Sequence, residues 1–322
     1  MRHIKSQGGV ILNIILFLLL IMILLIGGYF LYMNLPGKPQ VLDVVTSSNQ
    51  LEVSNLSYEV EQFYPNMKFN HNYISYSIGS DCSEEEKNNM IEAFNELQNK
   101  VGVISFSPKA SEPDIEVSCS ESIKNSIEKE YFIAGEGGAK EIIQTGRYNV
   151  ITQGVILLYG EKKGVKCDWP NVELHELLHV FGFAHSSDKN SLMYPYLESC
   201  DQKLDESIIN NIRELYSKEN LADLYFENAT GVKKGRYFDF NVTVRNLGTL
   251  DAESVYLSVF DDNDKMGNFN LKDIAFGAGV TYSVQNLKLN SRSSSDIKLV
   301  IDSEDLIKEI DKNNNFVEFK FE

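Results

Sequence analysis

The sequence predicts an α+β protein in three parts: an apolar N-terminal helix, a mixed α/β region and an all-β C-terminal region. Three observations carry this prediction. An uncharged apolar run opens the chain, helical and strand-like patterns alternate through its middle, and apolar residues alternate with period two after residue 221. The 322 residues are enough for two folded domains besides the helix.

The N-terminal run is long enough to cross a membrane. Residues 6–37 contain no charged side chain, and residues 10–33 are almost wholly apolar, which exceeds the ~20 residues that a bilayer requires. A signal peptide is the alternative, although its apolar region usually spans only about 7–15 residues before a small-residue cleavage site. Because Arg2 and Lys5 precede the run, the sequence predicts a single-pass signal anchor with a cytoplasmic N-terminus and the rest of the chain outside.

A polar segment follows the apolar run. Residues 34–54 contain Pro36, Gly37 and Pro39 and then a stretch of Thr, Ser, Asn and Gln. Pro, Gly and small polar residues in such density are typical of connections between folded elements. This segment is therefore predicted to be a linker or stalk.

The middle of the chain reads as mixed α/β. A helix is expected after Ser83, because Glu86 three residues later completes a capping box, and apolar residues then recur on one face. A closing helix is expected from the apolar spacing of residues 208–216. The expected strands are 72–78, 103–106, 114–117 and 150–158, and the glycines of residues 135–138 are expected to form a turn.

Five residues of the middle region have the spacing of a metal site. His175 and His179 are four residues apart, so on a helix they lie on the same face, and Glu176 lies beside them. Gly182 can adopt a left-handed conformation that ends the helix and turns the chain back, so that His185 supplies a third ligand. Three neutral imidazoles with a fourth position for water are typical of a catalytic zinc site.

This arrangement predicts the hydrolysis of peptide bonds without a covalent intermediate. Zinc lowers the pKa of a bound water from about 15.7 towards roughly 7 and polarises the carbonyl. Glu176 would act as the general base that takes the proton of the water and passes it to the leaving amine. A helix that carries two histidines and a glutamate by chance is the alternative, and the extension to His185 makes the metal site the favoured interpretation.

Residues 175–195 resemble the zinc-binding segment of the matrixins, a branch of the metzincin metalloproteases. The histidine motif is followed by Ser186 and then by Met193 and Pro195, where metzincins have the methionine turn beneath the zinc. The resemblance implies a metzincin fold, with a twisted mixed sheet and a zinc-binding helix, one catalytic Zn²⁺ and a peptide substrate. One departure is Leu197, where matrixins usually have a tyrosine of the specificity pocket.

The four cysteines fit an oxidising compartment. They are even in number, all follow the apolar run and none forms a CxxC pair: Cys82, Cys119, Cys167 and Cys200. Of the three connectivities, we favour 82–119 and 167–200, the second of which would bracket the zinc segment. Four buried free thiols remain the alternative.

The C-terminal region is expected to be a β-sandwich of Ig-like type. Short runs of alternating apolar residues are separated by turn residues such as those of 246–248 and 313–315. Residues 301–315 resemble the end of the adhesion modules called CARDB domains. These strands carry no cluster of catalytic residue types, so the domain is expected to add nothing to hydrolysis. The resemblance to adhesion modules implies a surface or cell-wall partner.

The expected organisation is a cytoplasmic tail at 1–9, a transmembrane anchor at 10–33, a linker at 34–54, a catalytic domain at 55–218 and a CARDB-like sandwich at 221–322. The net charge of −16 excludes a general nucleic-acid partner, which would need basic patches. The many carboxylates permit bound calcium, but no spacing demands it. The alternative function is a cell-surface adhesion protein whose metzincin domain is inert.

Overall fold

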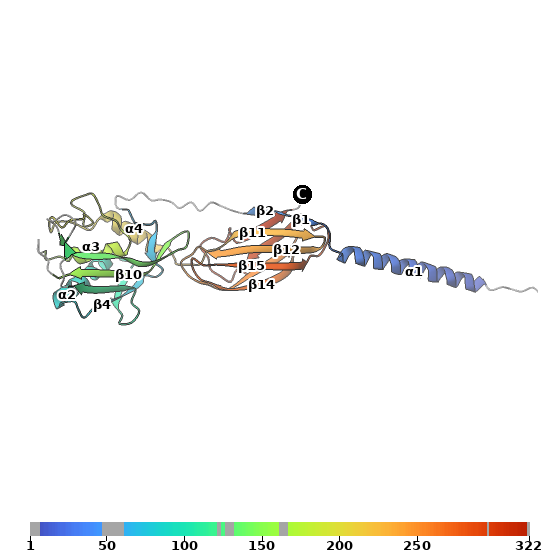
Figure 1. The fold of residues 1–322 in the computed structure, drawn as a ribbon, viewed down its shortest axis with the longest axis horizontal. Coiled ribbons are helices and arrows are strands. Elements are labelled where there is room, and N and C mark those ends of the chain that lie inside the picture. The colour runs from blue at the N-terminus through green and yellow to red at the C-terminus, as the bar shows by residue number, and fades with distance from the viewer. Residues whose placement is uncertain are drawn as a thin grey trace, which may run out of the picture.

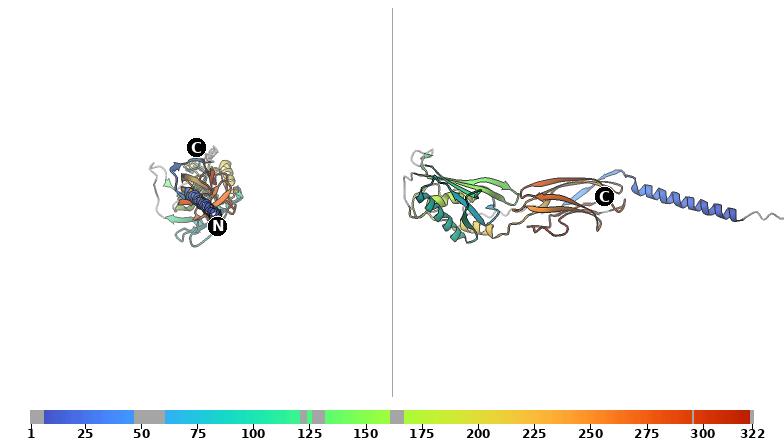
Figure 2. Two further views of the ribbon diagram at one scale, coloured as in Figure 1. Left: turned by 90° about the vertical axis from the view of Figure 1, so that its right-hand side faces the viewer. Right: turned by 90° about the horizontal axis from the view of Figure 1, so that it is seen from below.

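The computed structural model describes residues 7–46, 61–120, 124–125, 132–160, 167–294 and 296–320. Residues 1–6 of the expected tail lie outside these ranges, as do residues 47–60, which hold the end of the expected linker and the start of the expected catalytic domain. The described parts lie in a row, with helix α1 at one end, a β-sandwich in the middle and an α+β domain at the other end (Figures 1 and 2).

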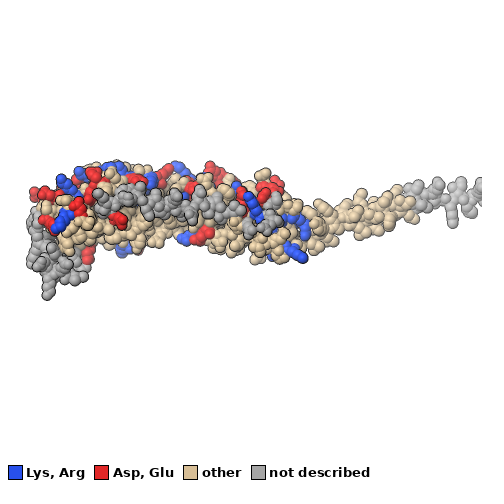
Figure 3. Space-filling model, turned by 90° about the horizontal axis from the view of Figure 1, so that it is seen from above, with Lys and Arg blue, Asp and Glu red and all other residues tan. Residues whose placement is uncertain are grey.

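Helix α1 spans Gln7–Asn34 and carries no charged residue. A window within Leu12–Asn34 has a mean hydropathy of 3.0 and is not buried against the rest of the protein. Among the described residues it is the one helix long and apolar enough to cross a membrane, a test that a signal sequence also passes. Figure 3 shows the helix without the charged side chains that cover the two domains.

Part of the expected linker belongs to the sandwich. Strand β1 (Pro39–Val41) pairs with β11 (Leu224–Lys234), and β2 (Asp43–Thr46) pairs with β17 (Phe316–Lys320). Leu42, between them, is only 6% exposed. Pro36, Gly37 and Pro39 made this segment resemble a loop in the sequence. Proline is nevertheless compatible with an edge strand, and β1 lies at the edge of its sheet.

The sandwich consists of two antiparallel sheets, as predicted. One sheet has the order β1-β11-β12-β15 and the other the order β14-β13-β16-β17-β2. Their remaining strands are β12 (Tyr237–Asn246), β13 (Ala252–Asp261), β14 (Asp264–Ile274), β15 (Gly279–Lys288) and β16 (Asp296–Ile301). Alternate apolar residues of both sheets form one buried core, in agreement with the period-two pattern.

The α+β domain contains a mixed six-stranded sheet. Five strands run parallel in the order β3-β10-β6-β4-β5, and β9, which is outside this order, pairs antiparallel with β10. Their bounds are Met67–Phe69 (β3), Tyr73–Ile78 (β4), Ser105–Pro108 (β5), Ile115–Ser120 (β6), Gly135–Gln144 (β9) and Asn149–Tyr159 (β10). Strands β7 (Lys124–Asn125) and β8 (Phe132–Ile133) form a separate pair.

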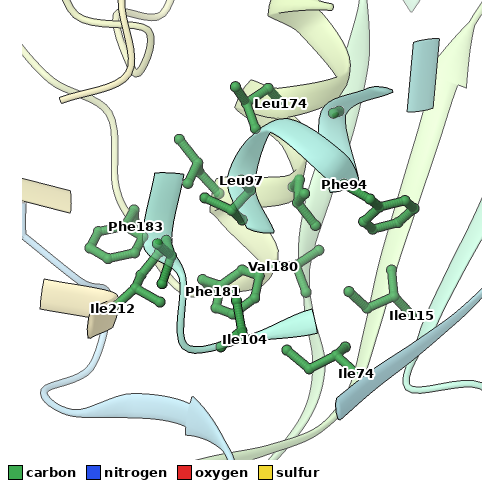
Figure 4. Packing of buried hydrophobic residues seen from close by; sticks show 14 of the residues in the cluster. Ile74, Phe94, Leu97, Ile104, Ile115, Leu174, Val180, Phe181, Phe183 and Ile212 are labelled. Carbon is green, nitrogen blue, oxygen red and sulfur yellow. The ribbon is translucent and has the colours of Figure 1, made fainter. Parts of the chain in front are cut away.

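Three helices pack with this sheet: α2 (Glu84–Val101), α3 (Asn171–Val180) and α4 (Glu206–Ser217). The capping box predicted for α2 is present, because Ser83 and Glu86 exchange hydrogen bonds at its start. Figure 4 shows side chains of the helices meeting those of the strands in one apolar core, to which Phe94, Val180 and Ile115 belong. Helix α3, which carries two of the candidate ligands, contacts helix α2 and strands β9 and β10.

The glycines of residues 135–138 do not form the expected turn. They begin β9, which lies against α3, and the approach leaves no room for a side chain at Gly135 or Gly137. A Cβ atom on Gly137 would lie 2.1 Å from the backbone oxygen of Glu176. The glycine run therefore serves the close contact of a strand with a helix, a second use of glycine besides turns.

The tip of the hairpin between β9 and β10 joins the two domains. The hydroxyl of Thr145 donates a hydrogen bond of 2.7 Å to the carbonyl oxygen of Leu247, and Arg147 donates to the buried carboxylate of Asp223. Asp311 lies 3.6 Å from the same guanidinium. Figures 1 and 2 show this hairpin reaching the end of the sandwich that lies away from α1.

The opposite end of the sandwich holds α1. Arg292 donates hydrogen bonds to the backbone oxygens of Tyr32 and Leu35, and its guanidinium lies 4.7 Å from the centre of the Tyr32 ring. A cation is favourable at a helix C-terminus, where backbone carbonyls lack partners within the helix. The sandwich therefore contacts both the helix and the α+β domain.

Candidate metal centre

Helix α3 and the turn after it bring three imidazoles together. His175 and His179 lie on one face of α3, and the left-handed conformation of Gly182, with a φ of 86°, returns the chain so that His185 reaches them. The three Nε2 atoms are separated by 3.1, 3.2 and 3.3 Å. In the described part of the chain this is the one group of three or more His, Cys, Asp or Glu side chains whose ligand atoms lie within 4.8 Å of one another.

Backbone carbonyls fix the orientation of two of the rings. Nδ1 of His175 donates to the oxygen of Leu192 and Nδ1 of His179 donates to the oxygen of Phe183, each over 2.7 Å. A carbonyl oxygen only accepts, so each Nδ1 carries the proton and each Nε2 presents a lone pair to the centre. Three Nε2 atoms at these separations can bind one cation between them.

Burial favours the neutral form of all three imidazoles. It lowers the pKa of His175 to about 3, where His179 adds to the effect, and lowers the pKa of His179 to about 4. The pKa of the more exposed His185 is also lowered by burial. Neutral imidazole is the form that binds metals, so protons do not compete with a metal ion near pH 7.

Glu176 follows His175 in α3 and is only 6% exposed. Burial raises its pKa to about 8, a hydrogen bond from the Gly137 backbone opposes this rise, and the nearby Glu136 and Glu173 add to it. A cation held by the imidazoles would favour the ionised carboxylate. Glu176 is thus a carboxylate whose proton affinity a bound metal would tune, as a general base requires.

Two glycines of β9 are part of the site and were missed in the sequence. A Cβ atom on Gly135 would lie 2.9 Å from Oε1 of Glu176, and one on Gly137 would meet the backbone of the same residue. Both glycines allow the edge strand to lie directly against Glu176. The Gly-Glu-Gly-Gly run is evident in the sequence, but nothing in it indicates that helix α3 packs against it.

The turn after His185 lies under the centre. Met193 is fully buried, its backbone oxygen accepts from the N–H of Ser186 over 2.8 Å, and the neighbouring Leu192 holds His175. Pro195, two residues after Met193, is exposed, and Leu197 is 36% exposed. The structure thus places the expected methionine turn beside the ligands, with its apolar side chain in the core.

Both favoured disulfides are present. Cys82 pairs with Cys119, which joins the start of α2 to β6, and Cys167 pairs with Cys200. The second bond brackets α3 and the methionine turn, as the spacing suggested. Cross-links of this kind stabilise a protein mainly by restricting the unfolded chain.

Comparisons with known proteins agree with this geometry. Residues 68–217 match the family model described as Matrixin, and residues 221–319 match the CARDB model. Residues 68–217 form a matrixin domain. Residues 221–319, which contain most of the sandwich, form a CARDB domain.

Two solved structures of a CARDB domain from Pyrococcus furiosus are similar to 31% of this chain. A crystal structure, described as a complex with di-metal ions, is 18% identical, and the match covers 85% of it with a TM-score of 0.26. A solution NMR structure is 17% identical, and the match covers 93% of it with a TM-score of 0.23. No curated protein matches the chain.

The matrixin domain belongs to a family that is zinc-dependent in general, and its three imidazoles fit that ion. Ligand atoms about 2.0–2.1 Å from a tetrahedral zinc lie about 3.3–3.4 Å apart, close to the Nε2 separations of 3.1–3.3 Å. The expectation of calcium gains no support from the described residues, since no group of carboxylates meets the same distance criterion.

Proposed function

We propose that this protein is a membrane-anchored zinc endopeptidase whose matrixin domain hydrolyses peptide bonds outside the cytoplasm. The observation that carries the proposal is the convergence of three Nε2 atoms next to a helix residue with a buried carboxylate, Glu176. His175, His179 and His185 hold the metal, and Glu176 is the base. The matrixin match supports a metalloprotease independently of this geometry.

In the proposed reaction, a zinc ion supplies Lewis acidity towards the carbonyl and makes water acidic enough to react near pH 7. Glu176 accepts the proton of the attacking water and transfers it to the nitrogen of the leaving amine. The Gly137 N–H and the close contact with β9 hold the carboxylate in place. The carbonyls of Leu192 and Phe183 keep the rings in the required tautomer.

The first test is metal content together with activity. Protein that starts at Lys38 keeps β1 and β2, so its sandwich is complete. It is expected to purify with one zinc per chain and to cleave an unfolded protein, and a chelator should abolish this activity until zinc is restored. A metal-free protein, or cleavage that a chelator leaves unchanged, would contradict the proposal.

The proposed topology is a cytoplasmic N-terminus with both domains outside. Helix α1 has the length and hydropathy of a membrane span, and the positive charges of Arg2 and Lys5 precede it. Two disulfides support an oxidising compartment. The intact mass of the membrane-bound protein decides between an anchor and a cleaved signal peptide, because an N-terminus beyond residue 33 would exclude the anchor.

The CARDB match supports a second candidate, an interaction domain that recognises a surface or cell-wall partner. We propose that the sandwich serves the protease in this way, whereas an adhesion protein with an inert matrixin domain would use the sandwich alone. The two differ in one measurement. If the Glu176→Ala protein performs every surface function of the wild type, the adhesion reading holds.

A further inference from the structure

The described chain enters the matrixin domain as a short segment beside the metal centre. Gln62 forms an antiparallel β-bridge with Phe183, in the turn between the second and third histidines. The N–H of Phe63 donates to the oxygen of Gly182 over 2.7 Å, and the N–H of Ala184 donates to the oxygen of Glu61 over 2.8 Å. These bonds attach residues 61–63 to the loop that positions the ligands.

The Gln62 side chain holds this segment in one conformation. Its Nε2 donates to the backbone oxygens of Met67 and Phe181, each over 2.9 Å, and its Oε1 accepts from the N–H of Met67 over 3.0 Å. Both N–H groups of the amide and its oxygen are therefore used. The oxygen of Pro65 also accepts from the side chain of Asn149 over 2.7 Å, which ties the segment to β10.

Phe63 projects from this fixed backbone onto a ligand ring. Its ring centre lies 6.0 Å from that of His179, with 26° between the planes, so the two rings are stacked. Yet 58% of Phe63 remains exposed, and the adjacent Tyr64 is 47% exposed. A preorganised aromatic surface is thus open to solvent at the edge of the metal centre.

We propose that Phe63 is a specificity-determining residue that contacts a large apolar side chain of the peptide next to the cleaved bond. The inference rests on the proposed function. A flat aromatic ring gains free energy by covering another apolar group, and a rigid backbone spares the cost of ordering it. Because the Phe63 ring stacks on His179, a proposed zinc ligand, it would lie close to the peptide bond that is cleaved. The contact would therefore involve a peptide residue next to that bond.

The test uses the full chain in detergent and a set of peptides that differ at one position at a time around the cut. Phe63→Ala is expected to reduce kcat/KM about 10-fold for peptides with Phe or Leu at the position that contacts Phe63. A 10-fold loss is the lower end of the effect of such apolar contacts on kcat/KM. Peptides with Ala at that position should be cleaved at the wild-type rate. Phe63→Tyr, which keeps the ring, should restore the preference.

Tyr73→Ala is the matched control, because Tyr73 is an aromatic residue of the same domain that is 81% exposed at the start of β4. It should leave the peptide preference unchanged. Zinc content is measured for every variant. Should Phe63→Ala lose zinc, Phe63→Leu and Phe63→Tyr are compared on the same peptides, and the inference then requires that they differ in their preference for aromatic residues.

The outcomes separate the inference from the proposed function. A change in kcat/KM that is equal for all peptides would show that Phe63 only shields His179, and would overturn the inference. A wild-type protein that binds zinc but cleaves no peptide would overturn the proposed function and the inference with it. A loss confined to peptides with large apolar residues supports both.

Discussion

The two domains differ in how far their function and stability depend on single contacts. In the matrixin domain a strand lies so close to α3 that Gly137 has no room for a Cβ atom, and backbone carbonyls fix individual rings. In the sandwich, stability is spread over alternate apolar residues of two sheets that form one core. Function in the first domain therefore depends on a few contacts, whereas the second should tolerate most single changes outside its core.

The sharpest expected effect is on Glu176. Glu176→Gln should keep zinc and fold while reducing turnover by about 10²–10⁴-fold, because the amide cannot accept the proton of water. Glu176→Ala should also lower turnover and leave zinc bound. The measurements are zinc content and kcat on one peptide, and near-wild-type turnover in a zinc-loaded variant would remove Glu176 from its assigned role.

His185→Ala should lower both zinc affinity and rate, because a site with two imidazoles binds zinc less tightly than one with three. Competition with a chromogenic chelator measures the affinity. His71→Ala is the control, since His71 lies outside the centre and pairs with Asp114 over 3.2 Å. Unchanged zinc binding in His185→Ala would mean that another group supplies the third ligand.

The contact between β9 and α3 can be tested with two neighbouring glycines. Gly137→Ala should destabilise the domain by about 1–3 kcal/mol and reduce activity, since its Cβ would lie 2.1 Å from the backbone oxygen of Glu176. A Cβ on Gly138 would meet nothing within 4 Å, so Gly138→Ala should behave as wild type. Equal effects of the two in thermal unfolding would contradict the close approach.

The junction of the domains depends on Arg147. Arg147→Ala leaves the buried carboxylate of Asp223 with the amide of Asn314 but without its cation, which should cost about 1–3 kcal/mol. Lys308→Ala removes an exposed ion pair with Glu219, for which about 0–1 kcal/mol is expected. Urea unfolding of both variants gives the comparison, and equal losses would show that Arg147 adds nothing special to the junction.

The smallest effect concerns pH and the sandwich. Burial raises the pKa of Glu309 to about 7, although Leu224 and Asn315 donate hydrogen bonds to its carboxylate. Because the folded pKa exceeds the unfolded value of about 4.5, its contribution to stability is complete below pH 4.5 and is lost as pH rises through about 7.

The sandwich should therefore melt at a lower temperature at pH 8 than at pH 5. Glu309→Gln should remove this part of the slope at the cost of one hydrogen bond, about 1 kcal/mol. Melting curves of wild type and variant at both pH values measure the slope. An identical slope in the variant would assign the pH dependence to other groups.

Patterns within a few residues of the sequence predicted the features that depend on contacts between near neighbours in the chain. The capping box at Ser83, the histidine spacing with Gly182 and the alternation in the sandwich each depend on neighbours within a few residues, and all are found as expected. The disulfide pairing was favoured but not fixed, because three connectivities satisfied the sequence.

Long-range contacts were not predictable in this way. The glycines of β9 are identified as a packing surface only when the position of α3 is known. Phe63 is identified as a residue of the site only because its ring stacks on His179. The strands at 39–46 were assigned to a linker because their partners lie more than 180 residues away in the sequence. Single-sequence patterns carry no information about such pairs.

Strands β1 and β2 also determine the order in which the protein can be completed. Their partners β11 and β17 belong to the last third of the chain, so the matrixin domain is an insertion within the sandwich. During synthesis both strands emerge early, and their partner strands do not exist until the ribosome has made the whole matrixin domain. The sandwich can therefore be completed only after all residues of the matrixin domain have been synthesised.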